Sequence, residues 1–136
     1  MNLNKKSIDL LKKVHPDLVK VVVRAAKDWS DKDTSFIITC GARTVEEQKV
    51  MVAKKLSSTM RSRHIIAANG YSHAVDFAFL VNGKAKWDWP GFHIIAKAMK
   101  AAAKAEKVSI EWGGDWKKFP DGPHFQLPWK LYPGSK

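Results

Sequence analysis

The sequence predicts an α+β protein with a small antiparallel sheet and helices packed on one side of it. Three observations support this prediction. Apolar residues recur at helical spacing in two long segments, short β-branched or aromatic segments lie between them, and the dipeptide Asn82-Gly83 marks a tight hairpin turn. The expected order is two helices, a strand, a helix, a long loop, a hairpin, a helix, a strand, a loop and a last strand.

The first part of the chain has a helical pattern followed by a strand. Apolar side chains recur every three to four residues between residues 4 and 29, and Pro16 is expected to begin a second helix there. His15, just before it, is interpreted as a boundary residue. The segment Thr34–Cys40 is β-branched and aromatic, which predicts a buried strand. Its last residue, Cys40, is expected to be a buried, inert thiol.

A strand-to-helix turn follows at Arg43. Thr44 and Glu47 have the spacing of a capping box, so a helix is expected from Thr44 to about Lys55. Arg43 then lies at the turn, from which its side chain can reach a cleft. Two interpretations of Arg43 stay open at this point: a cleft residue and a solvated surface arginine.

The second half combines short strands with one long helix. Residues 73–80 alternate as a strand, which is expected to return through residues 84–87 after the hairpin turn. Asp88-Trp89-Pro90 opens a helix, and His93 in its first turn is interpreted as structural or exposed. Further strands are expected at residues 108–112 and 123–127.

Length and composition favour one folded domain, residues 1–136, with its core at about residues 11–129. The chain of 136 residues is 45% hydrophobic, which argues against disorder. It holds one cysteine, so no internal disulfide can form. No apolar run approaches the roughly 20 residues that span a bilayer, and no apolar segment of a secretory signal follows Met1. We therefore expect a soluble chain made in the cytoplasm, with no stable membrane insertion.

The charge of the chain calls for an anionic partner. Its 24 Lys and Arg against 13 Asp and Glu leave a formal charge of +11. Nucleic acid, anionic lipid and anionic wall polymers all attract such a surface. The basic residues form no run of five or more, and no nucleic-acid-binding motif is present, so a nucleic-acid partner is not expected.

Two histidines and two aspartates have the composition of a hydrolytic zinc site. Such a site needs three protein ligands, an open position for water and a general base. In the strand at 73–80, Asp76 shares its face with two alanines, whereas His73 points to the other face. His64 is therefore the better partner for Asp76, with His73 as the alternative. His124 supplies the second imidazole, and Asp121 stands three residues before it.

The expected chemistry is the hydrolysis of an amide. Zinc bound by two imidazoles and one carboxylate would acidify its water ligand. Asp121 would take up the proton and return it to the leaving amine, and Arg43 would face the oxyanion. The spacing alone is weaker than a His-Glu-x-x-His helix, which this chain lacks.

The ordered motifs resemble those of the phage endolysin peptidases, zinc enzymes related to the D-alanyl-D-alanine carboxypeptidases. The matching segments are Ser62-Arg63-His64, His73-Ala74-Val75-Asp76, Glu111-Trp112-Gly113-Gly114-Asp115-Trp116 and Asp121-Gly122-Pro123-His124-Phe125. The resemblance implies a single peptidase domain. It also implies the site residues: the zinc ligands His64, Asp76 and His124, the catalytic Asp121 and Arg43, and the substrate-binding Ser62, Arg43, Trp112 and Asp115. The family commonly places the first histidine seven residues before the aspartate, whereas His64 stands twelve before Asp76.

The resemblance implies a zinc-dependent endolysin that cuts between L-alanine and D-glutamate in the peptidoglycan stem peptide. We expect a monomer that is made in the host cytoplasm and acts on the cell wall in the periplasm or envelope. The alternative within the class is a D-alanyl-D-alanine carboxypeptidase. Two rivals belong to other classes: a non-catalytic basic module that binds wall polymer or nucleic acid, and a lysozyme-like enzyme with paired carboxylates such as Glu111 and Asp121.

Overall fold

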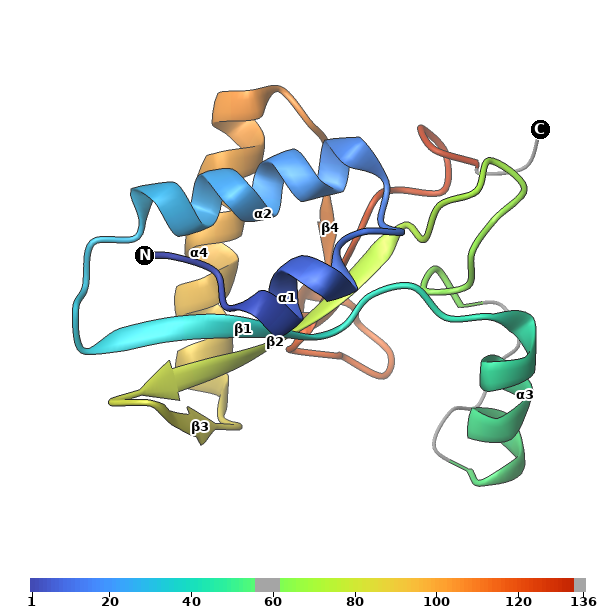
Figure 1. Ribbon diagram of the computed structural model, residues 1–136, viewed down its shortest axis with the longest axis horizontal. Coiled ribbons are helices and arrows are strands. Elements are labelled where there is room, and N and C mark those ends of the chain that lie inside the picture. The colour runs from blue at the N-terminus through green and yellow to red at the C-terminus, as the bar shows by residue number, and fades with distance from the viewer. Residues whose placement is uncertain (56–61, 134–136) are drawn as a thin grey trace.

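The computed structural model describes residues 1–55 and 62–133 of the chain. Its elements follow in the order that the sequence predicts (Figure 1). They are α1 (Lys5–Leu10), α2 (Pro16–Asp28), β1 (Thr34–Cys40), α3 (Val45–Ala53), β2 (Ala74–Val81), β3 (Lys84–Lys86), α4 (Trp89–Glu106), β4 (Glu111–Trp112), the short 3-10 helix η1 (Gly113–Asp115) and β5 (His124–Gln126).

The sheet is built around β2. Its strands follow the order β1-β2-β5-β4, β3 also pairs with β2, and every pairing is antiparallel. Figure 1 shows α2 and α4 lying together on one side of this sheet, while α3 stands apart at the far end of the molecule. The predicted α+β class, with a small antiparallel sheet and helices on one side, is confirmed.

The two faces of β2 serve different purposes. Val75, Phe77 and Phe79 belong to the hydrophobic core that α2 and α4 cover. Because side chains alternate along a strand, Asp76 points to the opposite face, away from this core. The face that the helices leave uncovered therefore carries the polar site.

The helices begin where local sequence signals place them. His15 caps α2, and its Nδ1 accepts a hydrogen bond from the backbone of Asp17 at 3.1 Å. Thr44 and Glu47 form the expected capping box at the start of α3. The interpretation of His15 as a boundary residue is confirmed. None of the helices in the described part of the chain is long and apolar enough to cross a membrane.

The strand predicted at residues 108–112 is shorter in the structure. Lys107 ends α4 in the left-handed conformation, and the backbone of Val108 still donates to Ala103 at 2.9 Å. Only the two residues of β4 are left to pair with β5. The η1 turn that follows packs tightly, because a Cβ on Gly113 would lie 2.4 Å from the carbonyl oxygen of Asp121.

The prediction that Cys40 is a buried thiol is wrong. Strict alternation would place Cys40 with Phe36 and Ile38, which are both in the core. The register of β1 against β2 shifts between Ile38 and Cys40, as in a β-bulge, and Cys40 pairs with Asp76. The bulge turns the half-buried thiol toward the polar face of the sheet.

Candidate metal centre

Asp76 is the centre of the polar face. It pairs with Cys40 of β1 on one side and with His124 of β5 on the other, so three strands bring these side chains into one row. Since the backbone hydrogen bonds of the sheet set this register, the spacing of the row does not depend on a loop.

His64 reaches the row from the chain that precedes β2. The backbone of Arg43 donates to the carbonyl oxygen of His64 at 2.8 Å, and Ile66 donates back to Arg43 at 2.9 Å. This short parallel bridge attaches the loop to the segment that follows β1. Ser62 supports the turn, because its Oγ accepts a hydrogen bond from the backbone of His64 at 3.2 Å.

The protonation of the His64 ring follows from its partners. Nδ1 lies 2.8 Å from the carbonyl oxygen of Gly41, and a carbonyl can only accept, so Nδ1 carries the hydrogen. In the neutral ring Nε2 then carries no hydrogen, and its lone pair faces Oδ1 of Asp76 at 3.2 Å. This atom is fully buried and makes no hydrogen bond of good geometry. A buried ring nitrogen without a hydrogen-bond partner is typical of an atom that binds a metal ion.

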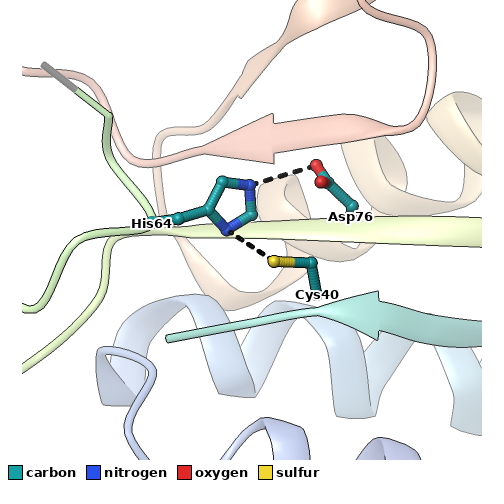
Figure 2. A group of neighbouring side chains, drawn as sticks. All are labelled: Cys40, His64 and Asp76. Carbon is teal, nitrogen blue, oxygen red and sulfur yellow. Dashed lines mark hydrogen bonds and ion pairs between the residues drawn. The ribbon is translucent and has the colours of Figure 1, made fainter. Parts of the chain in front are cut away.

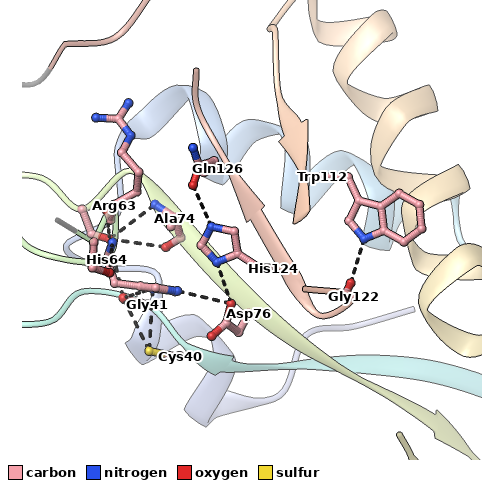
Figure 3. Close-up of polar contacts among 12 residues, drawn as sticks. Cys40, Gly41, Arg63, His64, Ala74, Asp76, Trp112, Gly122, His124 and Gln126 are labelled. Atoms are coloured by element: carbon pink, nitrogen blue, oxygen red, sulfur yellow. Dashed lines mark hydrogen bonds and ion pairs between the residues drawn. The ribbon is translucent and has the colours of Figure 1, made fainter. Parts of the chain in front are cut away.

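His124 approaches the same oxygen from the other side. Its Nε2 lies 2.8 Å from Oε1 of Gln126, and its Nδ1 lies 3.0 Å from Oδ1 of Asp76 (Figure 3). The centroids of the His64 and His124 rings are 5.1 Å apart. Two imidazole nitrogens therefore converge on one carboxylate oxygen.

The electrostatics of this arrangement favour a bound cation. Burial alone would lower the pKa of His64, but the Asp76 carboxylate outweighs burial and raises that pKa to about 10. Burial would also raise the pKa of Asp76, yet the imidazoles of His124 and His64, at 3.0 and 3.2 Å from its Oδ1, hold that pKa well below its usual range. Lone pairs aimed at a carboxylate repel it unless a proton or a metal ion lies between them.

Two sets of described side chains have ligand atoms close enough to share a metal ion. One set is Cys40, His64 and Asp76, and the other is Asp76, Asp121 and His124. Figure 2 shows the His64 ring between Asp76 and Cys40, with a different nitrogen facing each. Because Nδ1 of His64 faces the thiol, at 3.7 Å, and already donates to Gly41, Cys40 is the poorer ligand.

Asp121 lies beside the two ligand candidates of the second set. Its carboxylate oxygen is within 4.8 Å of the ligand atoms of Asp76 and His124. Burial of the carboxyl group, and then the negative charge of Asp76, raise its pKa. Its backbone donates to Gly113 at 2.9 Å, and the next residue, Gly122, accepts from Nε1 of Trp112 at 2.7 Å. The turn that carries Asp121 is thus held by the core.

Arg43 is held in place by two neighbours. Its Nη1 donates to Oε1 of the fully buried Gln48 at 2.7 Å, and its Nη2 contacts Sγ of Cys40 at 3.1 Å. The contact with Cys40 places the guanidinium next to the row that contains Asp76. Arg43 is therefore an oriented residue, not a freely solvated one.

The remaining predicted residues lie at different places. Trp112 is 4% exposed and stacks on Phe125, so it supports the turn at Gly122 from the core. Asp115 is exposed, and its partner is Lys100 of α4 at 2.9 Å. Among the described residues, their hydrogen-bond, ion-pair and ring partners do not include His64 or His124.

His73, the alternative first ligand, lies outside the row. It is buried, its Nε2 is 3.0 Å from the side-chain amide of Asn69, and its ring contacts His15. It precedes Ala74, the first residue of β2, and its ring lies against Asn69 and His15 and not at Asp76. The geometry thus favours His64 as the partner of Asp76.

Four further residues complete the site. The carbonyl of Gly41 accepts from His64, and Oε1 of Gln126 lies 2.8 Å from Nε2 of His124. Gln48 orients Arg43, and the ring of Trp116 lies 5.3 Å from that of His124. One of them had a signal in the sequence, since Gln126 is two residues after His124 and shares its face. The others depend on contacts between distant segments.

The chain belongs to the family of phage L-alanyl-D-glutamate peptidases, whose model matches residues 1–127. This confirms the family resemblance. The structure is similar to the crystal structure of the L-Ala D-Glu endopeptidase ChiX from Serratia marcescens, with a TM-score of 0.82 and 36% identity, over 98% of this chain and 94% of ChiX.

Curated relatives carry the same description. The chain is 38% identical over 117 residues to the L-alanyl-D-glutamate peptidase of Listeria phage A118, covering 85% of this chain and 39% of that protein. It is 34% identical over 116 residues to the enzyme of the same name from Escherichia phage T5, covering 82% and 79%. The chain thus spans well under half of the Listeria phage protein but most of the T5 protein.

Proposed function

We propose that this protein is a zinc-dependent endopeptidase that cleaves the bond between L-alanine and D-glutamate in the stem peptide of bacterial peptidoglycan. One observation carries the zinc assignment. Two buried imidazoles, those of His64 and His124, each direct one ring nitrogen at the same oxygen of Asp76. The choice of bond follows from the family and from the names of its members.

His64, Asp76 and His124 would hold the zinc ion. Two nitrogens and one carboxylate oxygen form the ligand set of a hydrolytic zinc site with an open fourth position. When bound, zinc would lower the pKa of water and polarise the scissile carbonyl. The hydrogen bond from Nδ1 of His64 to the carbonyl oxygen of Gly41 keeps that ring in the orientation that this requires.

Asp121 would act as the general base and then as the general acid. Its raised pKa suits a group that first accepts a proton from the attacking water and then returns it to the leaving amine. Arg43, held by Gln48 and Cys40, would donate to the oxyanion that develops on the carbonyl. Ser62, which supports the turn at His64, and Trp112 and Asp115, on the side of η1, would border the substrate.

The proposal extends to the setting of the enzyme. We propose that residues 1–136 act as one peptidase domain and as a monomer, made in the host cytoplasm and acting on the cell wall. The charge of +11 supports action on the cell wall, since attraction to an anionic envelope would concentrate the enzyme on its substrate.

The decisive experiment is mass spectrometry of the soluble fragments released from purified peptidoglycan. The protein is tested as prepared, after chelation and after zinc is added back. We expect new amino termini at D-glutamate that vanish with the chelator and return with zinc. Release of a terminal D-alanine alone would instead identify a carboxypeptidase. If neither cleavage depends on zinc, the proposed function is wrong.

A further inference from the structure

We propose that Gln126 is a positioning residue of the metal site, which selects Nδ1 of His124 as the nitrogen that binds the metal. The inference rests on the proposed zinc site and adds to it the residue that sets the tautomer of one ligand. Gln126 itself does not touch the metal ion or the substrate.

The contact between the two side chains is short and buried. Gln126 is 5% exposed and His124 is 6% exposed. Both lie on β5, two residues apart, and therefore on the same face of the sheet. Oε1 of Gln126 is 2.8 Å from Nε2 of His124, on the side of the ring away from Asp76 (Figure 3).

Glu111 sets which end of the Gln126 amide faces the histidine. It is the direct cross-strand neighbour of Gln126 on β4, and its Oε2 lies 3.5 Å from the amide nitrogen of Gln126. An ionised carboxylate can only accept hydrogen bonds, so the amide directs its N–H group to Glu111 and its oxygen to His124. Nε2 of His124 must then donate.

The consequence reaches the metal ligand. A neutral imidazole has one donor and one acceptor nitrogen, so a hydrogen on Nε2 leaves the lone pair on Nδ1. That atom lies 3.0 Å from Oδ1 of Asp76, on the side where the metal is proposed to bind. Without an acceptor at Nε2, His124 would divide between two tautomers. Loss of such an outer partner typically costs about 10- to 100-fold in metal affinity.

A plain structural role is the competing explanation, because a buried amide in a strand also needs partners. The chain offers a matched control in Asn69, whose amide nitrogen lies 3.0 Å from Nε2 of the buried His73. That pair is also an amide–imidazole contact, but His73 does not face Asp76. Loss of either amide should reduce stability, and only loss of Gln126 should reduce metal affinity.

The test compares zinc dissociation constants, measured by competition with a chromophoric chelator, and the position of the His124 ring hydrogen, measured by long-range proton–nitrogen NMR. We expect Gln126→Met to weaken zinc binding about 10- to 100-fold. The control Asn69→Leu should bind zinc as the unmodified protein does. The double exchange Glu111→Gln with Gln126→Glu keeps an acceptor toward His124, so it should recover most of the affinity and keep the hydrogen on Nε2.

Two results would overturn the inference while the zinc site stands: equal zinc affinity of Gln126→Met and the unmodified protein, or a His124 ring hydrogen on Nδ1 in the zinc-loaded protein. If Gln126→Met does not fold, the double exchange decides the matter, because an affinity as low as that of a ligand variant would contradict the proposed role. If the unmodified protein binds no zinc, the inference and the proposed zinc site both fail.

Discussion

His124 and Asp76 face each other across the pairing of β5 with β2, with Nδ1 of the histidine 3.0 Å from Oδ1 of the aspartate. His64 brings its Nε2 to within 3.2 Å of the same oxygen from a loop. The sheet thus sets one half of the candidate site rigidly, and the loop between α3 and β2 supplies the other half.

Asp76→Asn tests the metal site most directly. The amide keeps the size of the side chain but removes the charge that attracts a cation. We expect zinc affinity to fall by more than roughly 100-fold, the upper end of what loss of an outer partner costs. Chelator competition measures it. Asp115→Asn, which changes an exposed carboxylate paired with Lys100, should leave zinc affinity unchanged. Equal affinities in the two variants would contradict the assignment.

Asp121→Asn separates catalysis from metal binding. An amide cannot take a proton from water, so we expect kcat to fall about 100- to 10,000-fold, the usual contribution of a general base. Zinc content, measured by elemental analysis, should stay equal to that of the unmodified protein. An active Asp121→Asn enzyme would show that another group carries the proton.

Arg43→Lys tests the orientation of the guanidinium. Lysine keeps the charge, but one ammonium group cannot keep both the contact with Gln48 and that with Cys40. We expect kcat to fall about 100-fold, as for loss of one oxyanion donor, with a smaller change in KM. Steady-state kinetics on a stem-peptide substrate measures both. A change confined to KM would assign Arg43 to ground-state binding alone.

Arg63→Met tests the anchor of the loop that carries His64. Arg63 is 5% exposed and donates to the carbonyl oxygens of Leu127 and Tyr132, the latter at 2.6 Å. Loss of these charged hydrogen bonds should lower the free energy of unfolding by about 2–3 kcal/mol in urea titrations. Arg24→Met removes an arginine from solvent-screened surface ion pairs and should lower the free energy of unfolding much less than Arg63→Met does. Equal losses would argue against the anchoring role.

His73 should make the protein less stable in mild acid. Burial, and then the charge of Arg63, lower the pKa of His73 from 6.5 to about 4. Between these values the unfolded chain binds a proton that the folded chain does not, so the unfolding free energy falls as pH falls from 6.5 to about 4. His64 has its effect in a separate window. Its raised pKa stabilises the metal-free folded protein below pH 6.5, and this stabilisation is lost as pH rises from 6.5 to about 10.

The check on His73 is a comparison of urea unfolding at several pH values. His73→Gln should flatten the pH dependence between 6.5 and 4 relative to the unmodified protein, because its side chain does not titrate there. The titration of carboxylates contributes equally to the unfolding free energies of both proteins, so it cancels when one pH profile is subtracted from the other. Parallel pH profiles for the two proteins would show that His73 is not buried in its neutral form.

Local patterns in the sequence determined most of the fold. The capping box at Thr44, the proline at the start of α2 and the Asn82-Gly83 turn each act within a few residues, so they could be predicted without the tertiary structure. Alternation along the predicted strand likewise places Asp76 on the face opposite to His73, Val75 and Phe77, and it favours His64 over His73 as the partner of Asp76.

The tertiary structure alone decided the details of the site. The bulge that turns Cys40 toward Asp76 arises from a register shift between two strands, which strict alternation does not show. The tautomers of His64 and His124 depend on a carbonyl 23 residues away from the first and on an amide oriented by the neighbouring strand β4 for the second. Such contacts join segments distant in the chain, and only packing brings them together.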